Sequence, residues 1–273
     1  HEVEADMASP AAAPARARAR LPHHAGFGVG LAATFAMLVG ASAPSPFYPV
    51  LQADLGYSQA TSTIVFAIYA VALLVTLLVT GSLSDHVGRR PVLSAGLVVL
   101  ALSMLLFWHA DSLAILLTAR TVQGVATGLL LSTLAAVVVD FEPPDRPGSA
   151  ATLNSSFPLL GLAFGALAGG VAIDYLDRPL TVVFGALVAV YLVLGCVVWA
   201  LPETSARRDE GLLEALVPRI GLPPSSRAAF TRSAPALFAG WATGGFYLSL
   251  GAPLVLQTFD EPNHVLQGLV VTA

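Results

Sequence analysis

Two apolar runs, residues 61–80 and 91–108, are separated by a polar turn of only ten residues, 81–90. At a rise of 1.5 Å per residue, a helical run of about 20 residues crosses the ~30 Å hydrocarbon core of a bilayer. Because the turn between them is short, the two helices must run antiparallel. This pair predicts a chain that crosses a membrane more than once.

The composition extends this prediction to the whole chain. Hydrophobic residues make up 56% of the sequence and charged residues only 11%, which is typical of a polytopic membrane protein of the all-α class. We expect a disordered cytoplasmic tail at 1–24, a six-helix transmembrane bundle at 25–202 and a cytoplasmic linker at 203–233. We expect the start of a second bundle at 234–273, with a seventh helix at 234–259 and the beginning of an eighth at 265–273.

The arginines predict the orientation in the membrane. If the helices alternate in direction, eleven of the thirteen arginines fall on one side, in the tail, the 81–90 turn, the loop before residue 149 and the linker. Arg120 lies inside the fourth apolar run, and Arg178 is in a loop on the other side. Since basic loops stay in the cytoplasm, we expect a multi-pass plasma-membrane protein with a cytoplasmic N-terminus.

The 81–90 turn carries a recognisable motif. It reads Gly-x-Leu-x-Asp-x-x-Gly-Arg-Arg, and its fixed positions are Gly81, Leu83, Asp85, Gly88, Arg89 and Arg90. In this position, between the second and third helices, it resembles the signature loop of the major facilitator superfamily of secondary transporters. The resemblance implies a 6+6 helix fold in which the two halves rock about a central cavity.

In that interpretation the turn forms a cytoplasmic latch. A carboxylate near a helix N-terminus is stabilised by the helix dipole, and an adjacent arginine can pair with an acid at a neighbouring helix end. We predict that Asp85 belongs to the latch and that Arg89 or Arg90 pairs with Asp140, at the cytoplasmic end of the fourth helix. An exposed pair contributes only ~0.2–1 kcal/mol, so the latch can bias a conformational equilibrium without driving it.

Arg120, inside the fourth apolar run, is a second candidate functional residue. Burying its guanidinium in a membrane costs at least ~2.5 kcal/mol, so it should face a polar interior or a partner, unless it reaches the nearer interface along its own stem. Arg120, Gln123 and Gly124 are also similar to the superfamily's motif in helix 4. Gly124 and Gly128 form a face of small residues suited to close helix contact.

The fifth helix contains Gly161, Gly165, Gly169 and Gly170. This spacing resembles the antiporter motif of the same superfamily, except that Ala166 stands where the motif has proline. Two interpretations stay open, a groove along which a neighbouring helix rocks, and ordinary close packing.

Substrate contacts are predicted from polar or aromatic groups inside the spans. The first helix contains Pro44, Pro46 and Pro49, which remove backbone donors and predict either a broken helix at a gate or a simple helix end. Tyr48 lies in this segment, and Trp241 and Tyr247 lie in the seventh helix. Arg120 suits an anionic solute, whereas the aromatic residues suit an apolar one.

No enzyme constellation, metal-ligand cluster or nucleic-acid surface is visible, and no cofactor is expected. The expected partners are the lipid bilayer, a small-molecule substrate and protons. The resemblance to the major facilitator superfamily implies a secondary active transporter of a small organic solute, of the drug or metabolite efflux type and coupled to protons. Alternatives are a facilitator or importer of a sugar-like or anionic metabolite, a membrane sensor, and a non-functional fragment. The sequence is expected to be a truncated record that stops at the start of the eighth helix.

Overall fold

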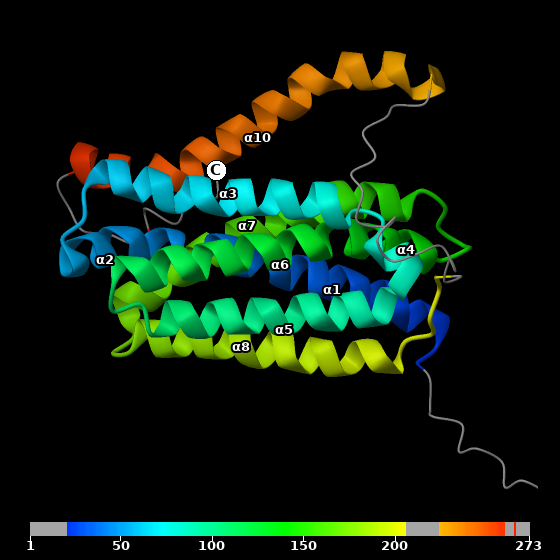
Figure 1. Ribbon diagram of the computed structural model, residues 1–273, viewed down its shortest axis with the longest axis horizontal. Coiled ribbons are helices and arrows are strands. Elements are labelled where there is room, and N and C mark those ends of the chain that lie inside the picture. The colour runs from blue at the N-terminus through cyan, green and yellow to red at the C-terminus, as the bar shows by residue number, and fades with distance from the viewer. Residues whose placement is uncertain (1–20, 206–223, 260–264, 266–273) are drawn as a thin grey trace, which may run out of the picture.

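The structure is a computed structural model and describes residues 21–205, 224–259 and 265. Long helices lie side by side in one bundle, and α10 crosses over one side of it (Figure 1). The elements are α1 (His23–Ser42), η1 (Ser45–Phe47), α2 (Tyr48–Leu55), α3 (Gln59–Thr80), α4 (Leu83–Val87), α5 (Arg89–Trp108), α6 (Leu113–Asp140), α7 (Ser149–Tyr175), α8 (Pro179–Val197), η2 (Val198–Ala200) and α10 (Pro224–Phe259).

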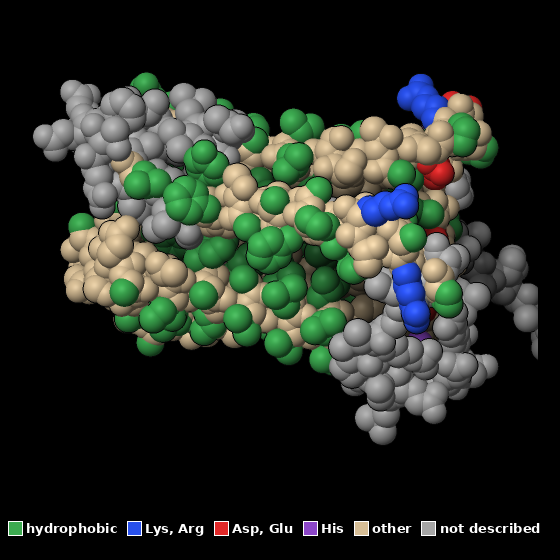
Figure 2. Space-filling model, turned by 90° about the horizontal axis from the view of Figure 1, so that it is seen from above, with side chains coloured by type: hydrophobic (Ala, Val, Ile, Leu, Met, Phe, Trp, Pro, Cys, Tyr) green, Lys and Arg blue, Asp and Glu red, His purple; other side chains and the backbone are tan. Residues whose placement is uncertain are grey.

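Six segments of the described chain are long and apolar enough to cross a membrane. They are His24–Leu55, Gln59–Thr80, Arg89–Trp108, Leu113–Asp140, Ser149–Tyr175 and Pro179–Ala200. The predicted all-α polytopic fold is thereby confirmed. The outer surface agrees with it, since hydrophobic side chains cover the face seen in Figure 2 along its length and arginines gather at one end.

The core lies where α6 meets its neighbours α3, α5 and α1. Met37, Leu100, Met104 and Leu116 are fully buried there. On the outside of the bundle, residues such as Leu74 of α3 are exposed, as expected for a helix that faces lipid.

The first predicted helix, which contains Pro44, Pro46 and Pro49, is divided into three segments. The chain leaves the α-helix after Ser42, forms the 3-10 turn η1 and restarts as α2 at Tyr48. Pro44 and Pro46 explain the break, because proline lacks the N–H that would continue the ladder. The first span is therefore broken and continues as α2, whereas a role of this break as a gate stays a prediction.

Other boundaries also shift. α1 begins at His23, inside the predicted tail, and Arg89 and Arg90 are the first residues of α5 instead of the end of a turn. α10 begins at Pro224, so the last part of the predicted linker is helical. α10 is not among the six membrane-length apolar segments, and the span at 234–259 stays a prediction. The remaining parts of the tail, the linker and the eighth run lie outside the described residues.

Candidate functional site

The first site is a polar network where α5 begins. Glu203 follows η2 and places its carboxylate over the N-terminus of α5. The backbone N–H of Arg89 donates to its Oε1 (2.8 Å) and that of Arg90 to its Oε2 (3.2 Å). These are two of the four N–H groups that a helix start leaves without a partner, and the negative charge also favours the positive end of the helix dipole.

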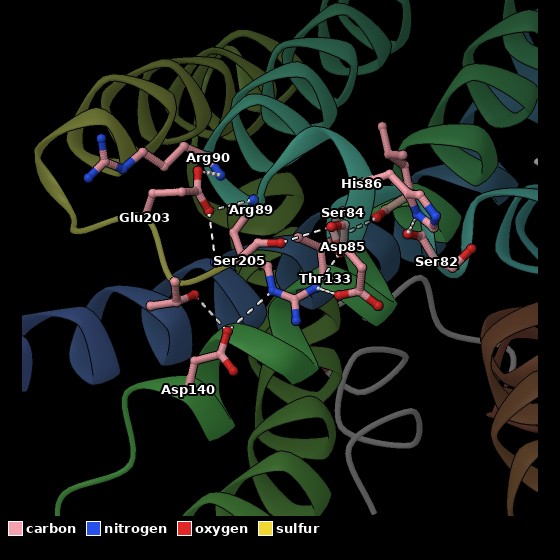
Figure 3. A network of polar contacts seen from close by, with 12 residues as sticks. Ser82, Ser84, Asp85, His86, Arg89, Arg90, Thr133, Asp140, Glu203 and Ser205 are labelled. Atoms are coloured by element: carbon pink, nitrogen blue, oxygen red, sulfur yellow. Dashed lines mark hydrogen bonds and ion pairs between the residues drawn. The ribbon is translucent and has the colours of Figure 1, made fainter. Parts of the chain in front are cut away.

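The guanidinium of Arg89 joins three elements (Figure 3). Nη1 donates to Asp85 Oδ1 (2.5 Å) and to Ser84 Oγ (2.6 Å), both on α4. Nε donates to Asp140 Oδ2 (3.2 Å) at the end of α6. The Arg89 side chain is only 15% exposed, so water screens these ion pairs less than pairs on an open surface.

Two hydroxyl side chains beyond α8 complete the network. Thr204 Oγ1 donates to Asp140 Oδ2 (2.7 Å), and Ser205 Oγ donates to the carbonyl oxygen of Asp85 (3.0 Å). The chain after η2 therefore holds the ends of α4, α5 and α6 together. We call Ser84, Asp85, Arg89, Asp140, Glu203, Thr204 and Ser205 the signature network.

The predicted latch residues do not all enter this network in the same way. The structure places Arg89 against Asp140, whereas the guanidinium of Arg90 points away from Asp85 and its Nε and Nη2 have no hydrogen-bond partner (Figure 3). Gly88 has φ +112°, a left-handed conformation that favours glycine and turns the chain from α4 into α5. Gly81 closes α3.

Arg120 forms the second site, deep in the bundle, and does not reach an interface. It is completely buried. Nη1 donates to Gln123 Oε1 (2.5 Å) and to the carbonyl oxygen of Ala41 (3.4 Å), and Nε donates to the Tyr48 hydroxyl. Among the described residues no carboxylate pairs with it, and its Nη2 has no hydrogen-bond partner.

Three aromatic rings surround this guanidinium. The Arg120 Cζ atom lies 5.0 Å from the ring centre of Tyr48, 5.3 Å from that of Tyr69 and 5.2 Å from that of Phe107. Cation–π attraction of each ring contributes about 0.5–2 kcal/mol when the cation is desolvated. The rings, the Tyr48 hydroxyl and the carbonyl dipoles together replace water around the charge.

Gln123 supports the break in α1. Pro44 has no N–H, so the carbonyl of Gly40, four residues earlier, loses its helical donor. The Gln123 Nε2 donates to this carbonyl oxygen at 2.7 Å. Tyr57, in the loop after α2, also stabilises the broken segment, because its hydroxyl donates to the Tyr48 carbonyl oxygen (3.2 Å). Burial raises the pKa of Tyr57 to about 12, so this hydroxyl stays protonated and remains a donor.

The glycines of α6 bring it against α3, as predicted. A Cβ atom added to Gly124 would lie 2.5 Å from the carbonyl oxygen of Tyr69, and one added to Gly128 would lie 2.5 Å from that of Leu73. Both distances are too short for a real contact, so α3 and α6 approach each other at a separation that only glycine permits.

The predicted glycine face of α7 packs on α1. A Cβ atom at Gly161 would lie 2.8 Å from the carbonyl oxygen of Phe35, and one at Gly169 would lie 2.6 Å from that of Ala43. A Cβ atom added at Gly165 would likewise lie too close to the carbonyl oxygen of Val39. Gly170 is also buried in α7. This is the close packing of one of the two interpretations, and rocking along the face stays a prediction.

The three predicted substrate residues do not come together. Tyr48 is buried against Arg120. Trp241 and Tyr247 lie on α10 and are 65% and 41% exposed. In the described chain they therefore share no pocket with Tyr48, because α10 lies outside the bundle that encloses it.

Sequence reasoning missed four residues of the signature network: Ser84, Glu203, Thr204 and Ser205. Glu203 and Thr204 had a signal, since they follow the sixth helix on the side predicted to hold the arginines. Ser84 and Ser205 had none beyond being polar. In the part of the chain that the structure describes, no group of three or more His, Cys, Asp or Glu side chains could hold a metal ion.

Comparisons with known proteins identify a family and several proteins that this chain is similar to. The sequence model of the Major Facilitator Superfamily matches residues 29–273. The puromycin resistance protein pur8 of Streptomyces alboniger is 33% identical over 172 residues, which cover 63% of this chain and 34% of that protein. The cephamycin export protein CmcT of Amycolatopsis lactamdurans is 36% identical over 131 residues, or 47% of this chain and 27% of that protein. The matched parts of the chain thus cover between about a quarter and a third of the length of these relatives.

Among solved structures, the human organic anion transporter MFSD10 has a similar fold. Its TM-score is 0.65 at 19% sequence identity, and the match covers 93% of this chain and 70% of that one. At this identity the likeness concerns the fold alone.

Proposed function

Because this chain belongs to the major facilitator superfamily, we propose that it acts in secondary active transport, exporting a small organic solute across the plasma membrane by alternating access coupled to protons. The observation that carries the proposal is the signature network. It ties together the ends of α4, α5 and α6 through Arg89, Asp85 and Asp140.

The free energies of the interactions in the network are large enough to bias an equilibrium between two conformations. Exposed ion pairs contribute about 0.2–1 kcal/mol and hydrogen bonds to charged groups about 1.5–3 kcal/mol. Since 1.4 kcal/mol corresponds to a factor of ten, an exposed ion pair shifts the ratio of two states up to about fivefold, and a hydrogen bond to a charged group shifts it about tenfold or more. Such a shift is too small to lock one state permanently, as an alternating mechanism requires.

The arginines support the orientation of the proposed latch. Arg89, Arg90 and Arg146 lie at the end of the bundle that contains Asp140, and Arg178 lies at the opposite end. By the positive-inside rule the network faces the cytoplasm, together with the N-terminus. A cytoplasmic latch regulates opening toward the side from which an exporter takes its solute.

The direction and the solute class are supported by the relatives. One is a puromycin resistance protein and another a cephamycin export protein, so small organic solutes that leave the cell are the best starting point. Coupling to protons rests on the family. In the described spans the acids Asp54, Asp140 and Asp174 lie at or near helix ends, so the described interior offers no carboxylate for a proton.

A second candidate is a facilitator or importer of an anionic metabolite. The observation that favours it is Arg120, a buried cation whose Nη2 has no hydrogen-bond partner. A carboxylate solute could occupy that donor. The two candidates differ in the predicted response to Arg120→Gln, which abolishes transport of an anion but only alters transport of a neutral or cationic drug.

The test uses inside-out vesicles from cells that express the chain. We expect accumulation of puromycin that depends on an imposed proton gradient and stops when a protonophore is added. The control is Asp145→Asn, which changes an exposed acid outside the network at the same end of the bundle. Accumulation of puromycin that a protonophore does not affect would refute the coupling. Equal transport by the chain and by empty vesicles, for puromycin, a cephamycin and a panel of organic anions, would refute the proposed function.

A further inference from the structure

A long apolar groove runs between α7 and α8, with α1 as its floor. Its volume is about 800 Å³, and every side chain that lines it is apolar or aromatic. Phe35 and Val39 of α1, Phe164 and Ala168 of α7, and Ala186 and Ala189 of α8 are among them. The alanines leave the space that larger residues would fill.

The groove has the length of one lipid leaflet. Along α8 it extends from Val182 to Leu194, which at 1.5 Å per residue is roughly 18 Å. Half of a ~30 Å hydrocarbon core is ~15 Å. One end of the groove lies at Tyr175 and Leu176, beside the turn that joins α7 to α8, and the other lies near the middle of the bundle.

The surroundings of the groove define what can fill it. It lies on membrane-spanning helices and offers no charged group to orient a polar solute. At its outer end stand Tyr175, which is 77% exposed, and a turn of mixed charge in which Arg178 lies beside Asp177 and near Asp174, all three exposed. Tyrosine is typical of the level of lipid headgroups, and arginine binds phosphate through its fork of N–H donors.

We propose that this groove binds one acyl chain of a phospholipid from the leaflet opposite the signature network, with the phosphate held by Arg178. The alanine-lined cavity takes the tail and the α7–α8 turn takes the headgroup. This site is independent of the transported solute, and it lies on the outside of the bundle, apart from Arg120 and the signature network.

The experiment measures lipid retention on the purified full chain by native mass spectrometry, after washing in detergent that contains palmitoyl-oleoyl phosphatidylethanolamine. We expect one retained lipid per chain. Ala186→Phe combined with Ala189→Phe fills the groove and should lower retention at least about tenfold, because excluding even two methylene groups changes affinity by that factor. Arg178→Gln should lower it about fivefold, as expected for one arginine near a phosphate.

The matched control is Ala67→Phe, the same change at an exposed position of α3 outside the groove. Both groove alanines are exposed, so their replacement displaces no buried atom.

A phosphatidylethanolamine with a photoreactive group in its tail should label peptides of α7 and α8. Equal retention in the groove variant and the control, or labelling confined to α3 and α10, would overturn the proposal. Displacement of the lipid by puromycin would assign the groove to the solute, and pairing of two copies without lipid would assign it to a dimer. Retention of diacylglycerol as strong as that of the phospholipid would refute the role of Arg178.

Discussion

Glu203 offers the sharpest test of the signature network. Its carboxylate is the cap of α5, because it accepts the N–H groups of both Arg89 and Arg90. Replacing Glu203 with Ala removes both acceptors and the charge beside the helix start. Replacing it with Gln keeps one acceptor oxygen but removes the charge and the second acceptor, because the amide nitrogen of Gln is a donor.

The magnitude follows from these two contributions. Loss of an N-terminal cap costs about 0.5–2 kcal/mol, and loss of a charge that complements the helix dipole costs about 0.3–1 kcal/mol. Glu203→Ala should therefore lower the free energy of unfolding by roughly 1–3 kcal/mol. For a chain of this size, that corresponds to a fall in Tm of about 2–10 °C, and Glu203→Gln should lose about half as much.

The assay is thermal unfolding of the purified variants in one detergent, at low and at high salt. The control is Asp145→Ala, since Asp145 makes only an exposed pair with Arg146 (3.6 Å) and should change Tm by about 1 °C or less. The part of the Glu203 effect that comes from the dipole should shrink at high salt, because mobile ions screen it. A Tm for Glu203→Ala equal to that of Asp145→Ala would refute the capping role.

Three further changes test other parts of the structure. Asp85→Asn removes the charged partner of Arg89 Nη1, so the protein should insert normally but transport more slowly; normal transport by a well-expressed variant would contradict the latch. Gly128→Ala would put a Cβ atom 2.5 Å from the carbonyl oxygen of Leu73 and should lower Tm, whereas Gly28→Ala, with nothing within 4 Å, should raise or preserve it; equal Tm values would contradict the α3–α6 packing. Tyr191→Phe removes the hydroxyl that donates to the Ala36 carbonyl oxygen (2.9 Å) and should cost about 1 kcal/mol of stability, measured by unfolding in the same detergent.

The sequence predicted the features that depend on local chemistry. Apolar length defined the six spans, the prolines of the first span restricted that segment to a break or a helix end, and the spacing of four residues placed Gly161, Gly165 and Gly169 on one face. The partner of Arg89 was also predictable, because alternation of the helices brings the end of the fourth span to the side of the 81–90 turn. Asp140 is an acid at that end.

Contacts between distant segments could not be predicted in the same way. Glu203 caps a helix that begins 114 residues earlier, and its position after the sixth helix predicts the side of the membrane on which it lies but not the helix that it caps. Apolar content also did not predict the extent of the helix, since α10 already includes Pro224, ten residues before the predicted span at 234–259, and that span stays a prediction.

The two candidate sites share one physical problem, which is how to satisfy backbone groups at an interrupted helix. At α5 the free N–H groups lie at one end of the bundle, so a carboxylate can cap them and still exchange with water. At the break of α1 the free carbonyl of Gly40 lies in the bundle, where water is excluded, so the donor must be a side chain, and Gln123 provides it. Arg120 then has a second role besides its charge, since it holds both Gln123 and the Ala41 carbonyl. A change at Arg120 must therefore move the outer half of α1 as well as any bound solute, and the anion test should include Gln123→Leu, which disturbs α1 while keeping the cation.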